Sequence, residues 1–313
     1  MRAKLFIASA LVVMGGAVPN VGTAPFNVEA ATRDVQRYTQ TPLPVRFRLS
    51  KERGLLLSTW INGRGPYIFA LDTGAGMNLI TQRVVDEAQL TVRSARPIVM
   101  GGLTGARNTS SREALISRFA LGDQANVIGS TKTAMIVSLL TPGIDGILDP
   151  TDIYSPYGYS IDMPNQLIEA VDTSSRGPKR GNPVGEGAIV QWMRFGNSVR
   201  PFVRLGDGRL ALIDTGSGFG LAVNGRNAVI VGNRGNRASQ GTRDIAGGTI
   251  SSRRVTPTTI SIGELVLRGI PTDILFGVDD DAPVILGRDA LYPFKITFDP
   301  QRRLIEFATS ERS

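Results

Sequence analysis

The chain has neither cysteine nor histidine among its 313 residues. Without cysteine there can be no disulfides, thiol nucleophiles, iron–sulfur clusters, Cys₄ zinc sites or lipid attachment through an N-terminal cysteine. Without histidine there can be no Ser-His-Asp or Cys-His catalytic arrangement, no HExxH zinc site and no other imidazole-based metal centre. Carboxylates, hydroxyls, lysine, arginine and tyrosine remain, so any catalysis is expected to depend on aspartate or glutamate.

The chain also lacks a concentrated patch of charge. Its 35 lysines and arginines exceed its 27 aspartates and glutamates, which gives a net charge of +8. The arginines are scattered and form only short pairs such as Arg253-Arg254 and Arg302-Arg303. This pattern indicates a solvated cationic surface rather than a nucleic-acid site, so no nucleic-acid partner is predicted. With 42% hydrophobic residues, the chain can bury an ordinary globular core.

The N-terminus has the composition of an export signal. Residues 1–4 carry two positive charges, residues 5–18 are apolar, and small residues before position 31 offer cleavage sites. The apolar run is too short to span a bilayer and is followed by proline. We therefore expect a signal peptide over 1–30, an N-terminal segment over 31–41, and a periplasmic or secreted protein without a stable membrane span.

Three sequence blocks occur twice, in the same order. YIFALDTGAGMNLIT (67–81) matches RLALIDTGSGFGLAV (209–223), FALGD matches ISIGE, and residues 147–170 match 285–308. The separation from Asp72 to Ile147 is 75 residues, and that from Asp214 to Ile285 is 71. The repeat predicts two homologous units, 42–171 and 187–313. The stretch between them, 172–186, is rich in glycine, proline and serine and is predicted to be a linker.

Within each unit the pattern is that of β-structure. Short apolar runs such as YIFALD, LALID and KITFD are separated by glycine, proline, asparagine and aspartate, which is typical of short strands. Helices are expected only at 81–89, at 289–291 and over part of 150–156. The sequence therefore predicts an all-β protein with few helices.

An Asp-Thr-Gly motif follows an apolar strand in each unit, at 72–74 and 214–216. A single copy could be an ordinary turn. Two copies in the same place of a duplicated unit predict that Asp72 and Asp214 face each other across a pseudo-twofold axis. Two carboxyl groups in contact share one proton, so this pair can supply an acid and a base without histidine, metal or cofactor.

These motifs resemble those of aspartic proteases of the pepsin/retropepsin clan, in the two-lobed, single-chain bacterial form. Asp-Thr-Gly-Ala and Asp-Thr-Gly-Ser match the family's catalytic loops, and Ile285-Leu286-Gly287 matches its crossing strand. In the first unit the crossing strand reads Gly146-Ile147-Leu148, and Asp149 stands where the family has glycine. The resemblance implies two homologous retropepsin-like or pepsin-like β-barrel lobes related by a pseudo-twofold axis, with the active-site cleft between them.

The resemblance also implies roles for individual residues. Asp72 and Asp214 would be catalytic, and the hydroxyls of two threonines would brace the two loops against each other. The residues that would support the loops are Thr73, Gly74, Thr215, Gly216 and Ser217. A flap hairpin is expected within 98–111, with Gly101, Gly102 and Gly105 giving it mobility. The stretch 238–252 would form a second flap or a plain surface hairpin.

The implied activity is hydrolysis of peptide bonds in extended protein segments, without a cofactor. A hydrogen bond from the Ser217 hydroxyl would favour the charged form of Asp214, whereas Ala75 cannot act in this way on Asp72. We therefore expect activity up to weakly acidic or neutral pH. Because both motifs lie on one chain, a monomer is expected to suffice, with a protein or peptide substrate as its partner.

Three other interpretations follow from the same residues. A non-catalytic peptide- or envelope-protein-binding module could use this fold, although such a module would be expected to lose part of one motif. The glycines at 216, 218 and 220 resemble a phosphate loop, but the strand–helix alternation of a nucleotide domain is missing. The run 279–281 of three aspartates could bind a cation or simply form a solvated acidic loop.

Overall fold

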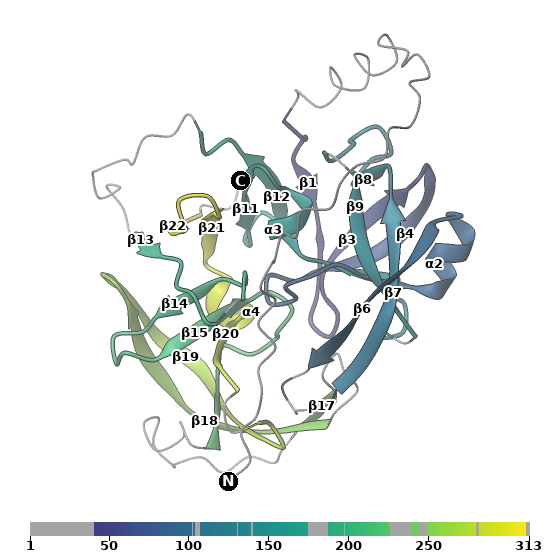
Figure 1. Cartoon of the computed structure of the whole chain (residues 1–313). Coiled ribbons are helices and arrows are strands. Elements are labelled where there is room, and N and C mark those ends of the chain that lie inside the picture. Colours follow the sequence, from purple (N-terminus) through teal and green to yellow (C-terminus); the bar gives the residue numbers. More distant parts are fainter. Residues whose placement is uncertain are drawn as a thin grey trace, which may run out of the picture.

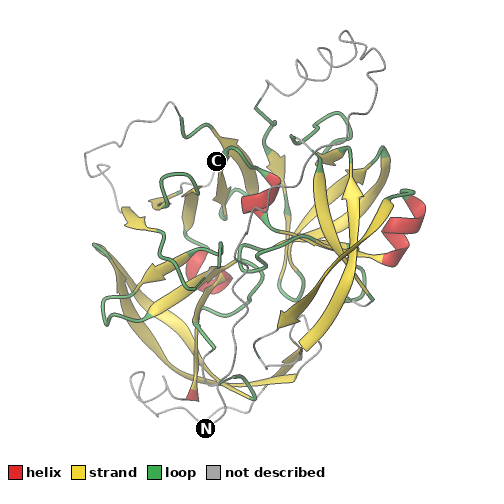
Figure 2. Cartoon of the chain, in the orientation of Figure 1, coloured by secondary structure: helices red, strands yellow, loops and turns green. Residues whose placement is uncertain are grey.

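The structure, a computed structural model, describes a subset of the chain. The described residues are 41–101, 103, 107–129, 131–138, 140–174, 187–196, 198–225, 240–243, 249–279 and 282–310. The predicted signal peptide 1–30, residues 31–40 and most of the predicted linker lie outside them. Strands make up most of the regular secondary structure of the described part, which confirms the predicted all-β fold class (Figure 2). No helix in that part is both long and apolar enough to cross a membrane.

Strands of the first lobe form a nine-stranded sheet. In spatial order they are β2 (Arg48–Ser50), β3 (Gly54–Ile61), β4 (Arg64–Leu71), β10 (Gly146–Leu148), β5 (Leu79–Thr81), β9 (Lys132–Val137), β7 (Arg107–Ile116) and β6 (Thr91–Gly101), with β8 (Phe119–Leu121) beside β3. Two short helices follow strands of this sheet, α2 (Gln82–Glu87) after β5 and α3 (Pro150–Ile153) after β10. Both helices fall within the ranges predicted for them.

Strands of the second lobe form a seven-stranded sheet with the same topology. In spatial order they are β14 (Phe202–Arg204), β15 (Leu210–Asp214), β20 (Val284–Gly287), β16 (Leu221–Asn224), β19 (Leu265–Phe276), β18 (Thr249–Ile262) and β17 (Gln240–Arg243). This order repeats that from β3 to β6. The crossing strands β10 and β20 run parallel to β4 and β15, respectively. Helix α4 (Arg288–Leu291) follows β20. The sequence repeat is therefore a repeat of topology.

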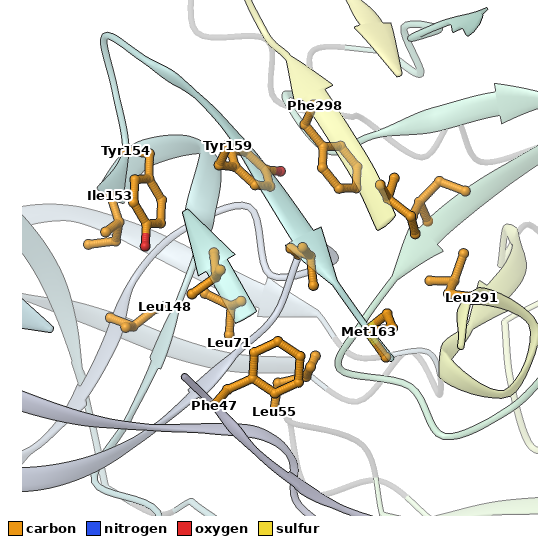
Figure 3. Close-up of a cluster of buried hydrophobic side chains, with 14 of the residues drawn as sticks. Phe47, Leu55, Leu71, Leu148, Ile153, Tyr154, Tyr159, Met163, Leu291 and Phe298 are labelled. Atoms are coloured by element: carbon orange, nitrogen blue, oxygen red, sulfur yellow. The ribbon is translucent and has the colours of Figure 1, made fainter. Parts of the chain in front are cut away.

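A third sheet joins the two lobes (Figure 1). Its order is β1 (Val45–Arg46), β12 (Leu167–Val171), β11 (Gly158–Asp162), β21 (Phe294–Asp299), β22 (Leu304–Thr309) and β13 (Ala188–Gln191). Strands β11 and β21 pair antiparallel at its centre, with Tyr159 opposite Phe298. These two rings stack 4.7 Å apart inside a buried apolar cluster that contains residues of both lobes (Figure 3). Continuous sheet and core thus hold the lobes together.

The crossing strands show how the two lobes have diverged in packing. Gly146 lies opposite Phe69 in the first lobe, and Val284 lies opposite Ala211 in the second. A Cβ atom at Gly146 would overlap the Phe69 ring, which is buried. Each lobe thus combines one small and one larger residue at this site, with the sizes exchanged, so that the volume between the strands is filled in both.

Replacing Gly146 with valine should therefore destabilise the protein by about 3 kcal/mol or more, because the Phe69 ring has no space into which to move. Urea unfolding of Gly146→Val, Phe69→Ala and the double variant would measure this effect. The double variant recreates the pair of the second lobe, so it should lose less stability than the two single losses combined. Additive losses would show that the two positions do not compensate each other.

Candidate active site

The two Asp-Thr-Gly motifs meet between the lobes, each at the end of a buried strand. Strand β4 ends at Leu71, directly before Asp72, and strand β15 ends at Asp214 itself. The parallel crossing strand supports each loop from behind. The Asp72 backbone nitrogen donates to the Leu148 carbonyl at 2.9 Å, and Asp214 lies opposite Gly287 in the register of β15 and β20. Residues distant in sequence are thus fixed to two rigid strand ends.

The threonines of the two motifs connect the loops through four hydrogen bonds. The Thr73 hydroxyl donates to the Ile213 carbonyl at 2.7 Å and accepts from the Thr215 backbone nitrogen at 3.0 Å. The Thr215 hydroxyl donates to the Leu71 carbonyl at 3.4 Å and accepts from the Thr73 backbone nitrogen at 3.1 Å. Both threonines have no exposed surface. The structure thus contains the cross-brace that the family resemblance implies.

The carboxyl groups of Asp72 and Asp214 lie together and hydrogen-bond to each other. Each also accepts from a backbone nitrogen, Asp72 from Gly74 at 2.7 Å and Asp214 from Ser217 at 3.0 Å. A Cβ atom at Gly74 would lie 2.8 Å from Asp214 Cγ, and one at Gly216 would lie 2.5 Å from Asp72 Cγ. The two glycines are therefore needed because each lies against the carboxyl group of the opposite loop.

Ser217 bonds to Asp214 through its backbone nitrogen, whereas the sequence predicted a bond through its hydroxyl. Its backbone nitrogen bonds to Asp214, whereas its hydroxyl accepts from the Phe219 backbone nitrogen at 3.4 Å. A backbone donor is available to any residue type. The difference between Ser217 and Ala75 therefore does not explain any difference between the two aspartates.

The surroundings of the pair favour one shared proton. Burial raises the pKa of Asp72, and the negative charge of Asp214 raises it further, to well above its ordinary value. Burial also raises the pKa of Asp214, but the hydrogen bond from Asp72 and the backbone donor of Ser217 oppose this rise. The two pKa shifts therefore favour a protonated Asp72 beside an ionised Asp214. Both residues keep part of their surface exposed, so water can reach them.

Asn78 was not predicted to be part of the site. It lies beside Asp149, the aspartate that occupies the position of Gly287 of the second lobe. In the second lobe the Gly287 backbone nitrogen donates to the Gly220 carbonyl at 2.9 Å, and a Cβ atom at Gly287 would lie 2.9 Å from the Ser217 carbonyl oxygen. In the first lobe Asn78 occupies the place of Gly220, and its side-chain oxygen accepts from the Asp149 nitrogen at 3.0 Å. In the first lobe a side-chain oxygen thus takes the place of the backbone carbonyl as the acceptor, and the donor is the nitrogen of an aspartate rather than of a glycine. Aligning the two units shows both differences, Asn78 against Gly220 and Asp149 against Gly287.

Asp149 is itself part of a buried polar cluster. Its side chain accepts from the Thr151 backbone nitrogen at 2.9 Å and so caps helix α3. The Asn78 amide donates to the Asp152 carboxylate at 2.6 Å, and the Lys132 ammonium donates to the Asp152 carbonyl at 2.5 Å. Asp149 is only 2% exposed, and this burial raises its pKa to about 6. Its charge therefore changes in the weakly acidic range.

This shift makes stability depend on pH. Because the pKa of Asp149 is higher in the folded chain than its ordinary 3.8, its contribution favours folding below pH 3.8 and is lost as the pH rises to about 6. Above that pH the buried carboxylate costs about 3 kcal/mol. Asp149→Asn keeps an acceptor for Thr151 and removes the charge. Its stability relative to the wild type should rise by about 2 kcal/mol between pH 4 and pH 7, measured by urea unfolding. A difference that does not vary with pH would contradict this assignment.

The predicted flap is the end of the hairpin formed by β6 and β7, where Gly101 lies opposite Arg107. Gly102 and Gly105 lie outside the described residues. The Leu103 carbonyl accepts from the Asp279 backbone nitrogen at 2.8 Å, and Leu103 packs against a small apolar cluster of the second lobe. The first-lobe hairpin therefore contacts the second lobe. Strands β17 and β18 form the hairpin expected at 238–252, whose Gly247 and Gly248 also lie outside the described part.

The structure describes one residue of the aspartate run 279–281, for which a cation site and a solvated acidic loop were the two interpretations. The Asp279 backbone contacts Leu103, whereas Asp280 and Asp281 are not among the described residues. Within the described ranges, no group of three acidic side chains is placed to hold a metal ion. The residues that the structure does bring together are the two aspartates and the threonines and glycines around them.

Comparisons with known proteins agree with this architecture. The profile of a family described as aspartyl protease matches residues 57–148, a range that includes Asp72 and ends before Asp214. The crystal structure of an aspartic proteinase from Irpex lacteus matches with a TM-score of 0.57 and 12% sequence identity, over 86% of this chain and 97% of that chain. No curated protein sequence matches significantly. The fold is that of a two-lobed, pepsin-like aspartic proteinase.

Proposed function

We propose that the protein is an aspartic endopeptidase that hydrolyses peptide bonds in extended protein segments. The observation that carries this proposal is the contact between the Asp72 and Asp214 carboxyl groups, held by two braced loops. Such a pair can deliver one proton and accept another within a single site. The match to an aspartyl protease family and the aspartic proteinase fold support peptide hydrolysis.

In the proposed reaction a water molecule lies between the two carboxyl groups. Ionised Asp214 takes a proton from the water as its oxygen attacks the peptide carbonyl carbon, and protonated Asp72 donates to the carbonyl oxygen. The resulting diol collapses as the carbon–nitrogen bond breaks. Asp214 then passes its proton to the leaving nitrogen, and Asp72 recovers its own from a diol hydroxyl. The dyad ends with the one proton with which it began.

The setting of this activity is also part of the proposal. The signal-like composition of residues 1–30 supports an exported protein that acts on envelope or secreted proteins. Both aspartates lie on the same chain, so a monomer would contain the whole site. The pKa of Asp72, raised well above its ordinary value, supports activity toward neutral pH because Asp72 must hold a proton in the reaction.

Incubating the purified protein with an unfolded protein substrate between pH 3 and pH 8 would test this proposal. We expect new peptide termini by mass spectrometry, and inhibition by a pepstatin-type statine, whose hydroxyl group imitates the diol. If the protein cleaves nothing over this range but binds unfolded chains, the non-catalytic binding module would be the correct interpretation.

A further inference from the structure

The two aspartates differ in the charge that lies behind them. The residues after the crossing strands occupy corresponding turns of the two lobes, and these turns carry Asp149 in the first lobe and Arg288 in the second. Asp149 directly follows Leu148, whose carbonyl accepts from the Asp72 backbone nitrogen. The Arg288 guanidinium donates to the carbonyls of Thr215 at 3.0 Å and Gly216 at 2.7 Å, the two residues after Asp214. Above about pH 6, where Asp149 is ionised, an anion thus lies behind one catalytic loop, and a cation lies behind the other at every pH.

Neither charge is neutralised by a close partner. Asp149 is 2% exposed and Arg288 is 6% exposed, and within the described ranges neither forms a salt bridge. The Asp149 carboxyl group accepts from the Thr151 backbone nitrogen, and the Arg288 guanidinium also donates to the Lys51 carbonyl at 2.8 Å. Because these partners are neutral groups in a poorly solvated region, the fields of the two charges extend to the dyad with little screening.

We infer that Asp149 and Arg288 are positioning residues that place the shared proton on Asp72 and leave Asp214 ionised. This inference deepens the proposed function and rests on it. Asp72 then acts as the acid and Asp214 as the base. The two lobes have the same topology, so the sheets alone would not distinguish the two aspartates. The opposite charges at the two turns contribute to this distinction, together with the Ser217 backbone donor to Asp214.

The other charged groups nearby act on the two aspartates less strongly than Asp149 and Arg288 do. The titratable and charged groups that act on Asp149 or Arg288 are Asp72, Asp152, Tyr159, Arg200, Asp214 and Asp289. Arg200 acts on Asp214, Asp72 and Asp149, in decreasing order, so it favours ionisation of all three and adds to the effect of Arg288 on Asp214. Tyr159 stays neutral because burial raises its pKa. Besides burial, which raises the pKa of both catalytic aspartates, Asp149 raises that of Asp72 and Arg288 lowers that of Asp214.

The dependence of kcat/KM on pH separates the two roles. The acid limb reports ionisation of the base and the alkaline limb reports loss of the proton from the acid. Asp149→Asn should move the alkaline limb down by about half to one pH unit and leave the acid limb in place. Arg288→Gln should move the acid limb up by a similar amount and leave the alkaline limb in place. Asp149→Asn thus narrows the pH range of activity from the alkaline side, and Arg288→Gln narrows it from the acid side.

Arg288→Lys is the matched control, because it keeps the charge and loses the planar fork that holds the carbonyls. It should keep the acid limb of the wild type even if kcat falls. A purely structural role would lower kcat/KM equally at every pH, and that result would overturn the inference, as would movement of the opposite limb. Circular dichroism melting of each variant would identify any that fails to fold.

A second measurement does not need activity. Carboxyl ¹³C signals of the full-length protein, assigned with Asp72→Asn and Asp214→Asn, should show that Asp72 keeps its proton to higher pH than Asp214. Asp149→Asn should reduce this difference. If the wild type cleaves peptides but Asp214 holds the proton, the inference is wrong and the proposed function stands. If the protein cleaves nothing while Asp72 keeps the proton, the proposed function is wrong.

Discussion

Replacing either Asp72 or Asp214 with asparagine should abolish peptide hydrolysis, with kcat/KM falling by about a thousand-fold or more. Asparagine can neither release nor accept the catalytic proton at these pH values. Its side-chain oxygen can still accept from Gly74 or Ser217, so each variant should keep its fold. Initial rates on a peptide spanning a mapped cleavage site, together with melting temperatures, would measure both effects.

The loss should also be non-additive. Because the two carboxyl groups act as one unit, the double variant should be no less active than either single variant. Asp123→Asn is a suitable control, since this exposed aspartate accepts from the Ala125 backbone nitrogen at 2.7 Å in a turn and asparagine can do the same. Wild-type turnover in either active-site variant would exclude the shared-proton mechanism.

Removing the Thr73 hydroxyl should have the largest effect on stability among conservative changes at the site. Thr73→Val keeps the shape of the side chain but leaves the Ile213 carbonyl and the Thr215 backbone nitrogen without their partner. Both groups are buried between the lobes, and each unsatisfied group costs about 1–3 kcal/mol. We therefore expect a loss of about 2–5 kcal/mol in urea unfolding, accompanied by a loss of activity.

Thr73→Ser separates the hydroxyl from the methyl group. Serine keeps both hydrogen bonds and should retain most of the stability and activity of the wild type. If Thr73→Ser were as unstable as Thr73→Val, packing of the methyl group rather than the brace would be what joins the loops. If Thr73→Val kept full stability, the brace would contribute nothing that water cannot replace.

The two lobes show how a duplicated unit can keep its topology while its contacts change. Gly220 and Gly287 form a direct backbone hydrogen bond in the second lobe, whereas Asn78 and Asp149 form a side-chain-to-backbone bond in the first. These exchanges occur in pairs because a close-packed interior accepts a larger residue only where its neighbour also changes. Through Asp149 and Arg288, the same divergence makes the surroundings of the dyad asymmetric.

Much of the fold could be predicted from the chain alone. Short apolar runs punctuated by glycine and proline predicted the strands, and the helix predicted at 81–89 is present at Gln82–Glu87. These features depend on local residue patterns, which the sequence displays directly. Repeated blocks of similar spacing added the long-range predictions, that there are two copies of a unit and that their Asp-Thr-Gly motifs face each other.

The sequence by itself determined which chemistry was available to this protein: no thiol, no imidazole, and one Asp-Thr-Gly motif in each of two repeated units. The tertiary structure alone decided how these groups interact. It brought Asp72 within hydrogen-bond reach of Asp214 and assigned the Asp214 contact of Ser217 to its backbone nitrogen. It also placed Asn78 against Asp149 across 71 residues of chain. Proton affinity depends on burial and on charges brought close by folding, and neither is visible in a local pattern of residues.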